Sequence, residues 1–186
     1  MTDHPTYRFD LCFSLPDPAQ DPEDLLDPLF EAGCDDALIG CGRRGSLGAT
    51  FSRRAESASE AVATAIRDVQ TGARGARLES VDPDLVSVSD ISFMAECSRQ
   101  NVRKHLEKNA PDMPSPAHLG NPALWHLAEI GPWLVANTPL RIPRETLEVA
   151  REAMRINLDL TRHRLESLPP LPEQEDSWEP PRAAHG

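Results

Sequence analysis

A short cationic segment, residues 98–108, carries side chains suited to recognising another molecule. Val102 and Leu106 lie four positions apart, so on a helix they share one buried face. The opposite side then carries Arg99, Gln100 and Arg103, with Lys104 at its margin. Such side chains form hydrogen bonds with base edges in the major groove and ion pairs with phosphates. The chemistry that this pattern predicts is recognition of double-stranded DNA.

The order of residues along this helix predicts a role for each of them. A recognition helix enters the major groove with its N-terminal end. Base contacts are therefore expected from the first turn, from Ser98, Arg99, Gln100 and Asn101. Phosphate contacts are expected further along, from Arg103, Lys104 and Lys108. The alternative interpretation is a helical hairpin whose charged face is only solvated, because charge runs on helices usually face water.

A shorter helix is predicted before the cationic one, at about residues 89–95. Ser89 is a suitable N-cap, and Asp90 suits the first helical turn. Ile91, Met94 and Ala95 repeat at the spacing of one buried face. This predicts a short amphipathic helix that packs its apolar side against the next one.

Glu96 and Cys97 form the predicted turn between these helices, with Cys97 filling the small apolar space between them. Ser98 then offers a second N-cap, whose hydroxyl can accept from the backbone N–H of Gln100 or Asn101. Two short helices joined by a tight turn, with the second one cationic, are typical of a DNA-binding helix-turn-helix.

The next segment has the order of a small wing followed by a third helix. Residues 117–119 and 123–125 are the strand candidates, with a turn at residues 120–122 between them. Apolar residues then recur at helical spacing, at Leu127, Ile130, Trp133 and Leu134. This is the layout of a winged helix-turn-helix.

Residues 89–134, about a quarter of the chain, resemble the MerR superfamily and its small excisionase-like (AlpA-like) relatives. The resemblance is carried above all by the stretches SRQNVRK and LWHLAEIGPWL. It implies a recognition helix at residues 98–108 and a wing that touches the flanking DNA backbone through His118 and Asn121. The turn position that carries Gly in such motifs is Glu96 here, and a β-carbon is less comfortable there if the backbone is left-handed.

The first 83 residues show a different pattern. Tyr7, Phe9, Leu11 and Phe13 alternate with polar residues, as in a strand with one buried face. Helical patterns cover residues 25–30 and 57–71, and further strand patterns cover residues 36–41, 47–52 and 76–81. The order βαββαβ indicates a ferredoxin-like domain. We expect its open sheet face or an edge to hold a second subunit, a protein partner or a small ligand.

Catalytic and metal-binding interpretations have less support. Asp35 and Asp36 are neighbouring carboxylates in a predicted loop, where solvated side chains are the plainer interpretation. Cys34 and Cys41 are seven positions apart, unlike zinc-binding pairs. The candidate histidines are scattered over a helix, the wing and the next helix, at His105, His118 and His126. We therefore expect no catalytic residue, no metal and no cofactor.

Composition limits what the chain can do. It has 186 residues, 39% of them hydrophobic, which suffices for one or two domain cores. Its formal net charge is −11, so DNA binding requires the positive residues to gather on one face. Residues 9–42 hold nine carboxylates and no Lys or Arg. No segment has the pattern of a membrane span or a secretory leader, and we expect a cytoplasmic protein with reduced thiols.

The segment 144–167 lacks Gly and Pro and shows two adjacent apolar seams, as expected for a long helix. MerR-type regulators have an antiparallel dimerisation helix after the winged domain, so the resemblance implies pairing of two subunits here, with Asn157 fixing the register. The alternative is that this helix folds back on its own chain. Residues 169–186 are rich in Pro and acidic residues and are predicted to be disordered.

The sequence therefore predicts an α+β protein in four segments: a ferredoxin-like domain (1–83), a winged helix-turn-helix domain (84–136), a C-terminal helix that dimerises or packs (137–168) and a tail (169–186). The predicted function is sequence-specific transcriptional regulation by a homodimer bound to double-stranded DNA. The runner-up is a protein-interaction module, antitoxin-like or an adaptor, whose acidic N-terminal domain binds a basic partner. In a third hypothesis, that domain senses a small molecule for the DNA-binding motif.

Overall fold

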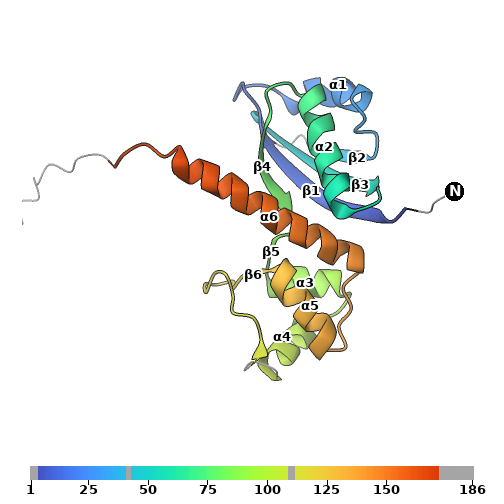
Figure 1. Cartoon of the computed structure of the whole chain (residues 1–186), viewed down its shortest axis with the longest axis vertical. Helices are drawn as coiled ribbons and strands as arrows, with labels where there is room; N and C mark the ends of the chain where they lie inside the picture. The colour runs from blue at the N-terminus through green and yellow to red at the C-terminus, as the bar shows by residue number, and fades with distance from the viewer. Residues whose placement is uncertain (1–3, 41–42, 109–111, 172–186) are drawn as a thin grey trace, which may run out of the picture.

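The computed structural model describes residues 4–40, 43–108 and 112–171. Over these residues the chain is a mixed α+β protein with six α-helices, a four-stranded antiparallel sheet and a two-stranded sheet. Figure 1 shows one unit built on the large sheet, a second built on short helices, and a long helix that runs between them. Most of the predicted disordered tail, residues 172–186, lies outside the described residues. No helix in the described ranges is both long and apolar enough to cross a membrane.

The first unit consists of β1 (Thr6–Ser14), the 3-10 helix η1 (Pro22–Leu25), α1 (Leu26–Glu31), β2 (Ala37–Gly40), β3 (Ser46–Arg54), α2 (Ala58–Gly72) and β4 (Arg77–Asp82). Its strands lie in the order β2-β3-β1-β4, and each neighbouring pair is antiparallel. Strands and helices follow one another as the patterns of the sequence predict.

The core of this unit follows from the alternation of apolar and polar residues in the central strands. The apolar residues of β1 and β3 are buried, among them Tyr7, Phe9, Leu11, Phe13, Leu47, Ala49 and Phe51. The rings of Phe9 and Phe51 stack with centroids 5.4 Å apart. α2 covers this layer and begins at Ser57, whose side chain accepts from the Glu60 N–H at 3.2 Å. Gly72 lies at its end, where a β-carbon would meet the backbone of α1 at 2.8 Å.

The second unit consists of β5 (Leu85–Val86), α3 (Val88–Met94), α4 (Arg99–Lys108), β6 (Trp125–His126) and α5 (Leu127–Asn137). Its core contains Val86, Ile91, Val102, Leu106, Trp125, Leu127, Ile130 and Leu134. The apolar spacing predicted for the third helix is confirmed, since Leu127, Ile130 and Leu134 are fully buried.

The predicted wing strands are wrong in extent. Only His118 and Leu124 form a bridge, through two backbone hydrogen bonds of 3.0 and 3.1 Å. Trp125 instead pairs with Val86 in the antiparallel ladder of β5 and β6. This pairing places both side chains in the buried core of the second unit, which a longer hairpin would not do.

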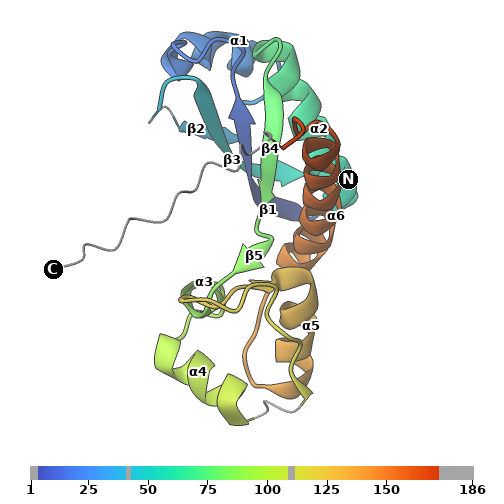
Figure 2. The ribbon, with the colours of Figure 1, turned by 90° about the vertical axis from the view of Figure 1, so that its left-hand side faces the viewer.

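The long helix α6 (Arg144–Glu166) packs on its own chain and joins the two units. Val149 and Ala153 belong to the core of the first unit, and Ala150 belongs to the core of the second. Figure 2 shows α6 on the β4 side of the sheet, with α5 below it. The prediction that Asn157 fixes the register between subunits is wrong, because its amide bonds to the N–H and C=O of Val81, each at 2.9 Å.

Candidate nucleic-acid interface

The segment that leads to the candidate interface is fixed by a reciprocal N-cap. Ser87, and not the predicted Ser89, caps α3, and its hydroxyl accepts from the N–H groups of Ser89 (3.1 Å) and Asp90 (3.4 Å). Asp90 Oδ2 accepts in return from the Ser87 N–H at 2.8 Å. A carboxylate at the third helical position selects Ser87, because both bonds of a capping box can form only from there.

The turn after α3 contains a residue with a left-handed backbone. Glu96 has φ +48°. Within the described ranges it is the one residue other than glycine whose φ is positive. The Cys97 N–H donates to the Ser92 C=O at 2.9 Å and closes the turn. The structure thus has a left-handed residue at the position where the sequence carries Glu in place of Gly. This turn sets the direction in which α4 leaves the core.

α4 begins as the sequence predicts. The Ser98 hydroxyl accepts from the Asn101 N–H at 3.2 Å, and the Ser98 carbonyl accepts from the Val102 N–H at 3.2 Å. Val102 and Leu106 are buried, which confirms the predicted inner face. This packing holds one side of the helix against the core and turns the other side outward.

The outer side of α4 carries the predicted contact residues. The exposed ones are Ser98, Arg99, Gln100, Arg103, Lys104 and Lys108, and Asn101 is half-buried. In the part of the chain that the structure describes, no carboxylate forms an ion pair with the four cations of this helix. Glu107 is the one acidic residue within α4. The helix therefore presents hydrogen-bond donors and uncompensated positive charge to solvent, which suits an anionic partner.

The residues of the predicted wing belong to the same unit as this helix. His118 and Asn121 are both exposed. The imidazole of His118 lies over Gly120, so closely that a side chain at position 120 would collide with it. The Trp125 indole N–H donates to the Pro114 carbonyl at 3.2 Å and ties the start of this segment to the core. The segment of the predicted wing is thus tied to the core near its start, while His118, Leu119 and Asn121 are exposed to solvent.

Two exposed apolar residues near this surface do not belong to the predicted contact set. Phe93 at the end of α3 and Leu119 at the wing tip are each 86% exposed. Phe93 lies in a shallow hollow beside the turn, together with Ser89, Cys97 and Arg99. The sequence could have indicated the exposure of Phe93, because this apolar residue does not fall on the helical face that Ile91 and Met94 share. Phe93, which lines this hollow together with Arg99, extends the candidate contact surface beside the start of α4.

His126 has a structural role at the junction between the units. Its Nδ1 lies 2.6 Å from Oδ1 of Asp84, a buried carboxylate. Oδ2 of Asp84 accepts from the side-chain amide of Asn157 at 2.8 Å, and its carbonyl accepts from the Leu127 N–H at 2.7 Å. Within the described ranges, no three histidine, cysteine or acidic side chains gather as a metal site would require.

The acidic and thiol groups of the first unit also have structural roles. The expectation that Asp36 is a solvated loop residue is wrong, because its carboxylate accepts two hydrogen bonds of 2.9 Å from the buried guanidinium of Arg53. Arg53 also donates to Asp68 at 2.7 Å. Burial raises the pKa of the Cys34 thiol to about 11, which favours the protonated thiol at neutral pH. Cys41 lies outside the described residues.

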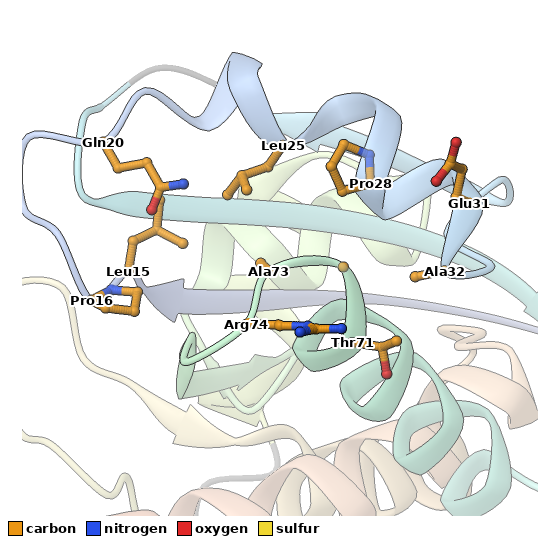
Figure 3. A pocket seen from close by; sticks show the side chains of 11 residues that line it. Leu15, Pro16, Gln20, Leu25, Pro28, Glu31, Ala32, Thr71, Ala73 and Arg74 are labelled. Carbon is orange, nitrogen blue, oxygen red and sulfur yellow. The ribbon is translucent and has the colours of Figure 1, made fainter.

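A groove of about 510 Å³ lies on the first unit, between the end of α2 and the segment that leads into α1. Figure 3 shows Gln20 and Leu25 on one side of it and Thr71 and Arg74 on the other. The carboxylate of Glu31 points away from Arg74. The lining residues, which all lie in described ranges, thus bring no pair of charged groups together.

No family model, curated protein or solved structure matches this chain. The chemistry of the exposed face of α4 is therefore the basis on which a function can be assigned.

Proposed function

We propose that this protein is a sequence-specific DNA-binding regulator of transcription that acts as a homodimer and reads the major groove with α4. The observation that carries the proposal is the outer face of that helix. Arg99, Gln100, Arg103 and Lys104 are exposed on it, and Val102 and Leu106 hold its opposite face in the core. Arginine and glutamine at the start of a recognition helix have the donors and acceptors that distinguish bases.

The arrangement of the elements supports the finer interpretation of the fold. The strand order β2-β3-β1-β4 with two crossing helices is the order of a ferredoxin-like domain, which we propose for residues 1–83. The α3-turn-α4 unit, the His118–Leu124 bridge and α5 follow the order of a winged helix-turn-helix, which we propose for residues 84–136. The resemblance to MerR-type and excisionase-like proteins belongs to the same proposal.

The roles along α4 give the proposal its test. Ser98, Arg99, Gln100 and Asn101 would read bases, whereas Arg103, Lys104 and Lys108 would neutralise phosphates, together with His118 and Asn121 of the wing. Arg99→Ala should reduce the preference for the specific site by about 1–3 kcal/mol per contacted base. Lys104→Ala should weaken binding to all duplexes alike and lower the salt slope by about 0.9.

The measurement is fluorescence anisotropy with one specific and one random duplex at several salt concentrations. Arg162→Ala is the matched control, since Arg162 is an exposed arginine of the long helix α6, outside the candidate interface. It should leave both affinities within about twofold, because Arg162 makes no base or phosphate contact in the proposed interface. Equal effects of Arg99→Ala and Lys104→Ala on both duplexes would refute the division into base and phosphate contacts.

A second function is favoured by the charge distribution. The nine carboxylates of residues 9–42 lie in the first unit, and the net charge of the chain is −11. These features suit a protein-interaction module, antitoxin-like or an adaptor, whose acidic domain binds a basic partner. The two functions differ in one observable, because contact of an interaction module of this kind with duplex DNA is secondary or absent.

A further inference from the structure

Phe93 is a large apolar side chain that the core of the second unit does not take up. It lies near the end of α3 and is 86% exposed, whereas Ile91, two residues before it, is fully buried. Burial of a phenyl ring removes a large apolar area from water, and the folded chain forgoes that gain here. Single exposed apolar residues are common on protein surfaces, so the surroundings of Phe93 decide whether it has a role.

The ring shares a hollow with the start of α4. The hollow has a volume of about 620 Å³, and its walls come from α3, from the turn and from the first residues of the cationic helix. Phe93 lines it, and so do Ser98 and Arg99, which are proposed to read bases. Ser98 is held in place because its hydroxyl accepts from the Asn101 N–H at 3.2 Å. A duplex that approaches Ser98 and Arg99 therefore meets the ring as well.

The charges around the hollow favour a base edge over the sugar-phosphate backbone as the group that meets Phe93. α3 carries Asp90 and no lysine or arginine, so it offers no ion pair to a phosphate. The exposed carboxylate of Glu96 also lines the hollow and repels phosphate. Arg99 is the one cation among the lining residues, all of which the structure describes, and its guanidinium suits the N7 and O6 atoms of guanine. Base edges carry no net charge, so Glu96 does not repel them in this way.

Thymine presents the apolar group that matches a phenyl ring. In the major groove the bases show hydrogen-bond donors and acceptors, and thymine shows a C5 methyl group in addition. The side chain of Phe93 has neither donor nor acceptor, so apolar contact is the interaction by which it can distinguish bases. We infer that Phe93 contacts the C5 methyl group of a thymine and makes the protein prefer a T·A pair beside the base that Arg99 reads. The inference rests on the proposed function, since it requires α4 in the major groove.

This contact gives α3 a part in sequence recognition, alongside the hydrogen-bonding residues of α4. Removing the area of one methyl group from water changes a binding constant by a factor of about four. The ring and the methyl group contribute through the same contact. Their losses should therefore not add, because once either group is gone the other gains nothing at this position.

The experiment measures fluorescence anisotropy of the full chain with its specific duplex and with a series of duplexes in which one thymine at a time is replaced by deoxyuridine. Deoxyuridine pairs as thymine does and lacks only the C5 methyl group. Wild type should bind one duplex of the series about fourfold more weakly than the specific duplex. Phe93→Ala should bind the specific duplex at least about fourfold more weakly than wild type does, and it should bind that deoxyuridine duplex within about 1.5-fold of the specific one.

The matched control is Phe30→Ala, which removes an exposed phenyl ring from α1 in the first unit. It should leave the affinity for the specific duplex and the loss on deoxyuridine as in wild type. Urea unfolding should show Phe93→Ala to be as stable as wild type, because a ring that is 86% exposed has few contacts to lose.

Specific binding by wild type that no deoxyuridine substitution weakens would overturn the inference and leave the proposed function standing. An equal loss on deoxyuridine for Phe93→Ala and wild type would overturn it as well, because another residue would then contact the methyl group. Failure of wild type to prefer any genomic fragment over random duplex would instead refute the proposed function, on which the inference depends.

Discussion

Asp82 and Asp84 lie two residues apart at the end of β4, in different surroundings. Asp84 is buried and bonded to His126 and Asn157, so its charge is matched by donors. The carboxyl of Asp82 receives one side-chain hydrogen bond, from Ser80 at 3.2 Å. Burial raises the pKa of Asp82, and the negative charges of Asp10 and Asp84 raise it further. The ionised form of Asp82 is therefore disfavoured in the folded protein.

Asp82→Asn should make the folded protein more stable at neutral pH. The pKa of this carboxyl is higher in the folded than in the unfolded chain. Its ionisation therefore lowers the free energy of unfolding of wild type, and this loss is complete above the folded pKa. Below the unfolded pKa of about 3.9 the group is protonated in both states, and the difference between variant and wild type should vanish. Urea unfolding of both proteins at a series of pH values measures this difference in the free energy of unfolding.

Asp35→Asn is the control for this prediction, because it removes the same charge at an exposed position. It should leave stability within about 0.5 kcal/mol of wild type at each pH. A gain for Asp82→Asn that persists unchanged at the lowest pH would contradict the argument, since it would not arise from ionisation.

At the scale of elements, α6 is held to the first unit by polar contacts as well as by its apolar face. Asn157→Asp retains the shape of the side chain but cannot donate to the Val81 carbonyl, and it places a second carboxylate where the amide now lies 2.8 Å from Asp84. We expect a loss of about 1–3 kcal/mol in the free energy of unfolding, because buried groups lose their partners.

Urea unfolding checks this expectation, with Thr161→Ala as the control one turn further along α6. Within the described residues, the Thr161 hydroxyl bonds to the Asn157 carbonyl of its own helix alone. It is also exposed, so its loss should cost about 0.5 kcal/mol or less. An Asn157→Asp variant as stable as wild type would show that the Val81 edge is not held by this residue.

The elements differ in how far the sequence predicts them. Alternation predicts β1 and its buried residues, and the spacing of Val102 and Leu106 together with Ser98 predicts the inner face and the start of α4. β5 and β6 have two residues each, and strands this short cannot show the alternation of apolar and polar residues by which a strand is predicted. The choice between Ser87 and Ser89 as the cap depends on the third residue after it, where only Ser87 has Asp90.

Tertiary contacts between distant residues account for what the sequence does not show of the fold. The pairing of Asp36 with Arg53, and of Asn157 with Val81, joins segments whose local patterns are independent. The apolar residues of α6 are likewise shared between the cores of the two units, and the spacing of these residues along the helix does not predict which core each one joins. The predicted contact residues of α4 are local to one helix, so the sequence could place them together on its exposed side.

At the scale of the whole molecule, the longest run of carboxylates and the cationic helix lie in different units. The carboxylates of residues 9–42 belong to the sheet unit, whereas the cations of α4 belong to the helical unit at the other end of Figure 1. α6 packs against both units and holds them together. An acidic protein of this kind should approach DNA with α4 foremost, and its affinity should fall steeply with added salt.

DNA binding by this protein is measured by fluorescence anisotropy of the purified protein with a pool of its own genomic fragments and with random duplex, at two salt concentrations. We expect tight binding to a few fragments, weaker binding to random duplex and a marked loss of both at the higher salt. Absence of binding even at low salt, with circular dichroism showing the helices formed, would contradict it and favour the protein-interaction function.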